Sequence, residues 1–203
     1  TRTRLSFELA EKRLSADTLN FTSTNSSVKK GESFEDTVKT LSAYGLDLIV
    51  LRDQHSGAPA LLRKYTDARI INAGDGKHQH PTQALLDLYT MRENFASLSG
   101  LNVAIVGDCL HSRVVGSLIP ALKTVGAHPV LVGPRSFMPK YLDALDVEYL
   151  ASIDEAIDSF DVIYLLRIQL ERLEGALIPS LEEYAELFGM NEQRLGRMKE
   201  RAI

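Results

Sequence analysis

The sequence predicts an α/β protein with two doubly wound lobes, each with a parallel sheet flanked by helices. Short apolar runs typical of buried strands alternate along the chain with stretches whose apolar residues recur every three or four positions, as in helices. This alternation indicates parallel sheets, because a helix carries the chain back between successive parallel strands. Ligands of such sheets bind outside the carboxyl ends of the strands, so residues that follow a strand are the first candidates for a site.

Composition narrows the class of protein. The 203 residues suit two small lobes, and 44% hydrophobic with 25% charged residues is ordinary for a globular chain. No apolar run is long enough for a secretory or membrane segment, so we expect a soluble, cytoplasmic protein without membrane contact. The single cysteine, Cys109, excludes an internal disulfide, and five scattered histidines lack metal-ligand spacing, so we expect no metal and no cofactor. A net charge of −4 argues against a nucleic-acid surface.

The first half of the chain is predicted to contain three strands. The expected elements are, in order, a helix through Leu14, a strand at 18–22, a helix from Ser33 to Gly45, a strand at 46–51, a short helix through Leu61 and Leu62, and a strand at 68–73. Ser33 lies three residues before Asp36 and marks a helix cap, while Gly45 marks the helix end. The polar stretch 23–31 can build no core and is expected to be a surface loop.

The second half is predicted to follow the same alternation. Pro81 suits a first helical turn, which makes His80 the cap of that helix and puts Gln83 in its first turn. The apolar pattern lapses around 94–100, so we expect one domain at residues 1–95 and another at 96–203. The elements expected after the lapse are a strand at 101–106, a helix at 114–125, a strand at 129–132, a short helix capped by Ser152, a strand at 161–166, and two short helices that start at Ser180 and Asn191.

Cationic side chains gather at the predicted strand ends. Thr1 to Arg4 bring two guanidinium groups and two hydroxyls to the start of the first helix, where unpaired N–H groups and the helix dipole favour an anion. Arg52, Arg113 and Arg167 each lie at or just past the end of a predicted strand. Arginines aimed at one crevice repel one another unless anions lie between them, which indicates a site for small anions. Structural alternatives stay open: the first turn binds no ligand, His80 only caps its helix, or each arginine caps a helix or pairs with a local carboxylate.

Five motifs, in this order along the chain, resemble the aspartate carbamoyltransferase family. They are Thr1-Arg2-Thr3-Arg4, Lys29-Lys30-Gly31-Glu32-Ser33, Val50-Leu51-Arg52, His80-Pro81-Thr82-Gln83 and Leu166-Arg167-Ile168-Gln169. The turn at 107–113 is similar to that of bacterial members, and it lacks the three-glycine spacing of a dinucleotide site. Two parts of the family's chain are absent, namely the segment before the first motif and the C-terminal His-Pro-x-Pro loop. Residues 201–203 also resemble the first residues of a strand. We therefore expect a fragment of the family's chain.

The resemblance implies transfer of the carbamoyl group from carbamoyl phosphate to the α-amino group of L-aspartate, in de novo pyrimidine synthesis. It assigns carbamoyl phosphate to residues 1–95 and aspartate to residues 96–203. The implied carbamoyl-phosphate-binding residues are Thr1, Arg2, Thr3, Arg52, His80, Gln83, Ser26 and Lys30, and those implied to be catalytic are Arg2, Thr3, Arg52 and His80. The implied aspartate-binding residues are Lys30, Arg113, Arg167 and Gln169. The family also implies a homotrimer in which Ser26 and Lys30 reach the adjacent subunit's site, and it allows a larger assembly with other pyrimidine-pathway chains.

The chemistry of these residue types agrees with that implication. A phosphate dianion beside a dicarboxylate needs cations that stay charged at physiological pH and offer forked donors, as arginine does. No residue stands out as a general base, so we expect attack by the neutral amine, a tetrahedral intermediate held by preorganised donors, and departure of phosphate with the proton.

Two alternatives to this function remain. An ornithine or other amino-acid carbamoyltransferase shares the arginine cradle and the His-Pro-x-Gln element, but Arg167 would repel the cationic side chain of ornithine. A non-catalytic carbamoyltransferase-like assembly subunit could lose site residues freely, yet every motif position within this chain is present.

Overall fold

The computed structural model describes residues 2–21, 34–168 and 180–203. The chain forms two compact units, Thr1–Gly76 and Lys77–Ile203, and each has a parallel sheet of its own. The domain boundary expected between residues 95 and 96 stays a prediction. No helix within the described ranges is long and apolar enough to cross a membrane.

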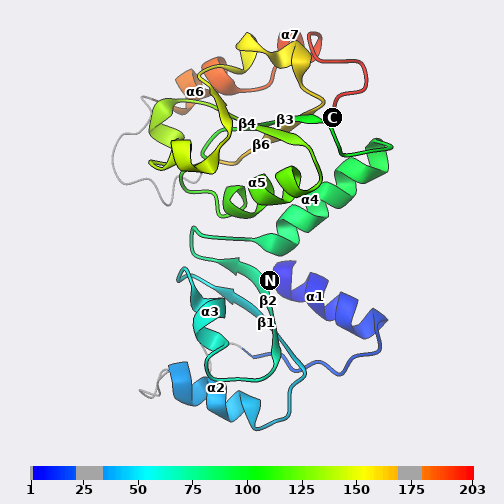
Figure 1. Cartoon of the computed structure of the whole chain (residues 1–203), viewed down its shortest axis with the longest axis vertical. Coiled ribbons are helices and arrows are strands. Elements are labelled where there is room, and N and C mark those ends of the chain that lie inside the picture. The colour runs from blue at the N-terminus through cyan, green and yellow to red at the C-terminus, as the bar shows by residue number, and fades with distance from the viewer. Residues whose placement is uncertain (1, 22–33, 169–179) are drawn as a thin grey trace. The chain divides into compact units, whose positions relative to one another are not determined.

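The first unit is built on a two-stranded parallel sheet. Its elements are α1 (Arg2–Arg13), α2 (Phe34–Ser42), β1 (Leu48–Asp53), α3 (Ala58–Leu62) and β2 (Arg69–Asp75) (Figure 1). Leu48 of β1 lies opposite Arg69 of β2. Among the described residues of this unit, the buried apolar side chains are Val38, Ala58, Leu62 and Ala73. α2 ends at Ser42, three residues before the predicted end, and a turn at 43–44 leads to Gly45, whose φ of 69° is left-handed. The expected Ser33 cap lies outside the described residues.

The prediction of a strand at 18–22 is wrong for residues 18–21, which the structure describes and which form no regular secondary structure. Thr22 lies outside the described residues. The side-chain amide of Asn20 instead donates to Glu8 Oε2 of α1 at 3.1 Å, so this stretch is tied to the helix. A strand needs a neighbouring strand for its backbone N–H and C=O groups, which a locally favourable composition does not supply.

The second unit has a four-stranded parallel sheet covered on both faces. Its helices and strands are α4 (Pro81–Asn94), β3 (Asn102–Val106), α5 (Val115–Thr124), β4 (His128–Val132), β5 (Glu148–Leu150), β6 (Val162–Leu165), α6 (Leu181–Phe188) and α7 (Glu192–Leu195), with 3₁₀ helices at Arg135–Phe137, Leu142–Leu145, Ile153–Glu155 and Ile157–Ser159. The strand order is β5-β4-β3-β6, and every pair is parallel.

The two faces of this sheet carry separate cores. Val103 and Ile105 of β3 pack in a core with Leu118 of α5, whereas Ala104 and Val106 pack in a second core beside the 3₁₀ helices that follow β5. Figure 1 shows α4 and α5 on one side of the sheet and α7 on the other. Because both faces of a parallel sheet are buried under helices, the predicted doubly wound α/β class is confirmed.

Helices of the second unit start at the capping signals that the sequence carries. Pro81 is the first residue of α4, with His80 as its N-cap. Ser180 Oγ accepts an N–H from the first turn of α6 at 3.0 Å, and Asn191 Oδ1 accepts one from α7 at 2.9 Å. Ser152 forms a capping box at a short 3₁₀ helix. These predicted starts are confirmed. β5 and the 3₁₀ helices between β4 and β5 were not predicted.

A buried arginine joins α7 to the segment after β5. Arg194 is 7% exposed and donates to both carboxylate oxygens of Asp154, from Nε at 3.1 Å and from Nη2 at 2.6 Å. Its other N–H groups donate to backbone carbonyls at the end of α6, those of Glu186, Leu187 and Gly189. Ile203 lies beside β6, where its N–H donates to Asp161 O at 3.1 Å and its carbonyl accepts from Ile163 N at 2.8 Å.

Candidate active site

In the first unit, the structure brings two predicted site residues together at the end of β1. Arg52 is the last residue but one of β1, because the strand ends at Asp53, two residues later than the sequence pattern indicates. Its Nη1 donates to Thr3 Oγ1 at 2.6 Å. Thr3 is the second residue of α1, directly after Arg2, so the Arg52 guanidinium lies at the N-terminal turn of that helix. A guanidinium beside the positive end of a helix dipole is suited to an oxyanion such as phosphate.

The loops that follow β1 and β2 are braced by a buried carboxylate. Asp75 is 1% exposed; its Oδ2 accepts the N–H of Gly57 at 2.7 Å and its Oδ1 accepts the side-chain amide of Asn72 at 2.7 Å. Gly76 has a φ of +46°, and a Cβ there would lie 2.3 Å from Ser56 Oγ and 2.7 Å from Ser56 N. The strand end that carries Arg52 therefore belongs to a tightly packed frame.

In the second unit, His80 is held by its backbone at the N-terminus of α4. Its N–H donates to Ser117 Oγ of α5 at 2.9 Å, and Ser117 is 7% exposed. One residue earlier in α5, a Cβ at Gly116 would lie 2.3 Å from the carbonyl oxygen of His78. The first turn of α5 therefore packs directly on the loop that leads into α4, and Gly116 is what allows the close approach.

Gln83, in the first turn of α4, is the other predicted residue of this loop and helix. Its Nε2 donates to Asp87 Oδ1 at 2.9 Å, one helical turn further on. Burial raises the pKa of Asp87, while hydrogen bonds from Gln83 and Tyr164 lower it. The same burial and the nearby carboxylate raise the pKa of Tyr164, so its hydroxyl stays protonated and can donate.

Arg113 and Arg167 follow adjacent parallel strands. Val106 of β3 pairs with Leu165 of β6, and the Leu166 N–H donates to Val106 O at 2.8 Å. Arg113 lies in the segment after β3 and is half-buried, whereas Arg167 lies two residues after β6 and is exposed. The structure thus brings both arginines to one edge of one sheet, as the strand-end pattern predicts.

The segment that carries Arg113 is anchored by a buried carboxylate–imidazole pair. Asp108 is fully buried and His111 is 6% exposed. Asp108 Oδ1 lies 2.9 Å from His111 Nδ1 and also accepts the His111 N–H at 3.1 Å. Such a pair gives His111 one preferred tautomer, with the proton on Nδ1.

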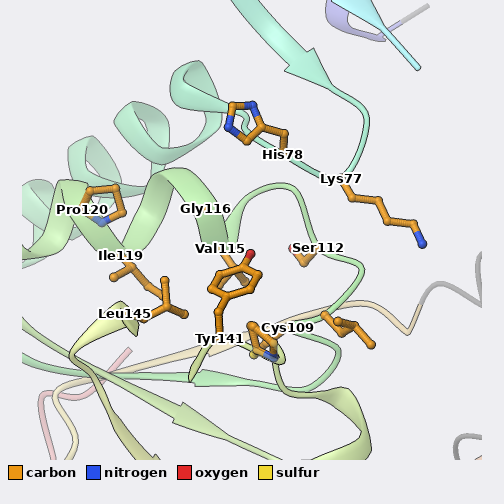
Figure 2. Close-up of a pocket in the computed structure, with 12 residues that line it drawn as sticks. Lys77, His78, Cys109, Ser112, Val115, Gly116, Ile119, Pro120, Tyr141 and Leu145 are labelled. Atoms are coloured by element: carbon orange, nitrogen blue, oxygen red, sulfur yellow. The ribbon is translucent and has the colours of Figure 1, made fainter. Parts of the chain in front are cut away.

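A pocket opens beside this segment (Figure 2). Cys109, Ser112, Gly116 and Tyr141 line it together with Lys77 and His78, and it holds about 370 Å³ of space, part of it open to solvent. Burial, with a smaller contribution from the Asp108 charge, raises the pKa of the Cys109 thiol to about 12. The thiol is protonated near neutral pH, so Cys109 is no nucleophile.

The predicted site residues are distributed over both units. Thr3 and Arg52, with Arg2 beside them, belong to the first unit, and His80, Gln83, Arg113 and Arg167 belong to the second. Thr1, Ser26, Lys30 and Gln169 lie outside the described residues. Across the described ranges, no group of three or more His, Cys, Asp and Glu side chains could hold a metal ion.

Sequence reasoning missed the residues that hold the predicted ones in place. These are Asp75, Asp87, Asp108, His111 and Ser117. A usable signal existed where the partners are close in sequence: Gln83 and Asp87 are four residues apart on one helix face, and Asp108 and His111 are three residues apart. The contacts of Asp75 with Gly57 and of Ser117 with His80 join segments far apart in the chain.

Comparison with known proteins gives a consistent set of relatives. Residues 1–93 match the family described as "Aspartate/ornithine carbamoyltransferase, carbamoyl-P binding domain". Aspartate carbamoyltransferase catalytic subunits from Heliobacterium modesticaldum and Granulibacter bethesdensis are 53% and 51% identical over 98% and 100% of this chain. This chain spans 64% of the length of each of these relatives.

Solved structures extend the similarity to the whole fold. Aspartate transcarbamoylase from Trypanosoma cruzi, in complex with carbamoyl phosphate and aspartate, is 31% identical with a TM-score of 0.88, over 100% of this chain and 68% of that chain. The catalytic subunit of M. Jannaschii aspartate transcarbamoylase is 42% identical with a TM-score of 0.75, over 92% of this chain and 62% of that chain.

Proposed function

Because the chain belongs to the aspartate carbamoyltransferase family, we propose that the full-length protein transfers the carbamoyl group of carbamoyl phosphate to the α-amino group of L-aspartate. The products are N-carbamoyl-L-aspartate and phosphate, and the reaction serves pyrimidine synthesis in the cytoplasm. The observation that carries the proposal is the pair of arginines, Arg113 and Arg167, at the ends of two adjacent parallel strands. A substrate with two carboxylates needs two such cations.

Residues 1–95 form the carbamoyl-phosphate-binding domain in this proposal. Arg52 and Arg2, with the hydroxyls of Thr1 and Thr3, hold the phosphate group. The 2.6 Å contact between Arg52 Nη1 and Thr3 Oγ1 supports this role, since it preorganises a charged and a neutral donor at one helix start. The site needs no reorganisation of these groups when the leaving phosphate gains charge.

The carbonyl of the carbamoyl group is polarised by Thr3, Arg52 and His80. His80 is held by its backbone N–H, and its ring Nδ1 lies 3.4 Å from Thr82 Oγ1. Gln83 holds the carbamoyl amide. As the amine attacks, the C=O bond becomes a C–O⁻ single bond, and donors already aimed at that oxygen lower the barrier.

Residues 96–203 form the aspartate-binding domain. Arg113 and Arg167 hold the two carboxylates, with Gln169 and Lys30 as further donors. The buried Asp108–His111 pair supports the role of Arg113, because it anchors the segment from which that side chain extends. The neutral α-amine then attacks the carbonyl carbon, the bond to the phosphate oxygen breaks, and phosphate leaves with the amine proton.

The rival substrate in the same family is ornithine. Arg167 favours aspartate, since a guanidinium near the side-chain end of the substrate attracts a carboxylate and repels an ammonium group. The test is phosphate release from carbamoyl phosphate by the full-length protein, with aspartate, with ornithine and with no acceptor. We expect release with aspartate alone. Release that favours ornithine would refute the substrate assignment, and the absence of release with every acceptor would favour a non-catalytic assembly subunit.

The same proposal includes a homotrimer in which Ser26 and Lys30 complete the site of the adjacent subunit. Trimers of Arg52→Ala and of Lys30→Ala should each be inactive and should complement one another after dissociation and mixing. With random assembly about three quarters of the trimers are mixed and one site in each escapes both defects, so roughly a quarter of all sites should work. Mixed trimers without restored activity would show that Lys30 serves its own chain.

A further inference from the structure

We propose that Asp87 is a positioning residue that fixes the orientation of the Gln83 amide, so that the Gln83 oxygen rather than its NH₂ group faces the carbamoyl group. The inference rests on the proposed function, in which Gln83 holds the amide of carbamoyl phosphate. It adds a residue that touches no substrate and acts through Gln83.

The geometry of α4 brings the two side chains together. Gln83 and Asp87 are separated by one turn of the helix, which places them on the same face. Gln83 Nε2 donates to Asp87 Oδ1 at 2.9 Å, a well-formed hydrogen bond. Both side chains are half-buried. Among the described residues, none donates a hydrogen bond to the Gln83 oxygen, so this acceptor is available to a ligand.

The chemistry of the two groups turns this contact into an orientation. The two ends of a glutamine amide are almost equal in shape, so a free side chain can present either its oxygen or its NH₂ group in a given direction. An ionised carboxylate only accepts hydrogen bonds. Asp87 therefore selects the NH₂ end, and the planar amide turns its oxygen away from Asp87.

The surroundings of Asp87 strengthen this selection. The carboxylate is half-buried and interacts with the hydroxyl of Tyr164 on β6. A carboxylate shielded from water is unfavourable unless donors satisfy it. Loss of the Gln83 bond would therefore remove a hydrogen bond and also leave a buried carboxylate oxygen without a donor. Gln83 and Tyr164 offset part of the burial that raises the pKa of Asp87, while Oδ2 of the carboxylate is buried without a hydrogen-bond partner among the described residues.

The carbamoyl group makes the orientation matter. Its NH₂ group can donate and cannot usefully accept, so it needs an acceptor such as the Gln83 oxygen. A flipped Gln83 would set one NH₂ group against another and would lose a hydrogen bond while leaving donors unsatisfied. Inorganic phosphate has no such group, so its binding should not depend on Asp87.

The test compares the binding of carbamoyl phosphate and of inorganic phosphate to the full-length protein by isothermal titration calorimetry. Asp87→Asn keeps the shape of the side chain but can donate as well as accept, so Gln83 is free to flip. We expect the Kd of carbamoyl phosphate to rise about fivefold to tenfold, the effect of one lost hydrogen bond, with the Kd of phosphate unchanged. Glu93→Gln, an equivalent change at an exposed position of the same helix, is the control and should leave both constants unchanged.

A double-mutant cycle separates positioning from a structural role. If Asp87 acts through Gln83, Asp87→Asn should add less than a twofold change in a Gln83→Ala background. If Asp87→Asn does not fold, Tyr164→Phe tests the same carboxylate from its other side and should raise the Kd of carbamoyl phosphate by about twofold, again with phosphate unchanged.

The outcomes distinguish this inference from the proposed function. Two results would overturn the inference while the proposed function stands. One is that Asp87→Asn raises the Kd of carbamoyl phosphate and the Kd of phosphate equally. The other is that the double variant raises the Kd of carbamoyl phosphate by the product of the two single effects, which would show that Asp87 and Gln83 act independently. A wild-type protein that binds phosphate but does not discriminate carbamoyl phosphate from it, or binds neither, would overturn the proposed function and this inference with it.

Discussion

Gly116→Ala tests the idea that the close packing of α5 on the loop before α4 positions His80. The added Cβ would lie 2.3 Å from His78 O, whereas ordinary contact begins at 3.4 Å, so one of the two segments must move by about 1 Å. The helix is the more firmly held of the two, because Leu118 and Leu122 of α5 are fully buried in the core. The loop should therefore yield, and with it the backbone of His80.

The expected magnitude differs between activity and stability. A misplacement of about 1 Å in a group that polarises the carbonyl costs on the order of 10²-fold in turnover. The clash costs about 1–3 kcal/mol, but alanine is better than glycine in a helix by about 1 kcal/mol, so the net loss of stability should be small. We expect a folded protein that is catalytically weak.

The assay is the turnover of the full-length protein at saturating carbamoyl phosphate and aspartate, together with its melting temperature. Gly196→Ala is the matched control, since a Cβ there meets its nearest atoms at 3.5 and 3.6 Å, in ordinary contact. It should leave turnover unchanged. If Gly116→Ala retains full turnover, or loses turnover only in proportion to unfolded protein, the packing of α5 does not position His80.

Three further predictions follow from the site and the fold. Arg167→Leu should weaken aspartate binding by about 1.5–3 kcal/mol and carbamoyl phosphate binding far less, measured by calorimetry, and equal losses would refute the assignment. His80→Ala should lower turnover by roughly 10²-fold, whereas unchanged turnover with a lower melting temperature would reveal a structural cap. Asp154→Asn should destabilise the protein at pH 7 but not at low pH, because the hydrogen bond from Arg194 lowers the pKa of Asp154 in the folded protein. The stability that the ionised Asp154 contributes is complete above its ordinary pKa near 3.8 and is lost as pH falls through the lowered pKa of the folded state. Denaturant unfolding of both proteins from pH 7 to below pH 3 measures this, and a pH-independent difference would contradict it.

The fold class was predictable because burial on both faces of a parallel sheet leaves a direct mark in the sequence. The β3 residues Val103 to Val106 are apolar at every position since each of the two cores takes alternate side chains. Capping residues such as Ser180 and Asn191 were equally readable, because a helix start depends on a few adjacent residues. The strand prediction was wrong at residues 18–21 because a strand forms only where a partner strand is available elsewhere in the chain.

The candidate site was predictable in part for the same reason. Arg113 and Arg167 could be assigned to one sheet edge from their positions after two predicted strands, since parallel strands end on the same side. The contact between Thr3 and Arg52, 49 residues apart, follows from tertiary packing that no local pattern encodes. The same holds for Ser117, because nothing in the sequence around it indicates that its hydroxyl accepts the N–H of His80.

The most direct test of the proposed activity is to follow the transferred carbon. The full-length protein is supplied with carbamoyl phosphate labelled with ¹³C and aspartate labelled with ¹⁵N, together with unlabelled ornithine, and the products are observed by NMR. We predict a carbamoyl ¹³C bonded to the aspartate ¹⁵N, formed with release of phosphate and abolished by Arg52→Ala. Label recovered only as bicarbonate from hydrolysis, or on ornithine in preference to aspartate, would contradict the account.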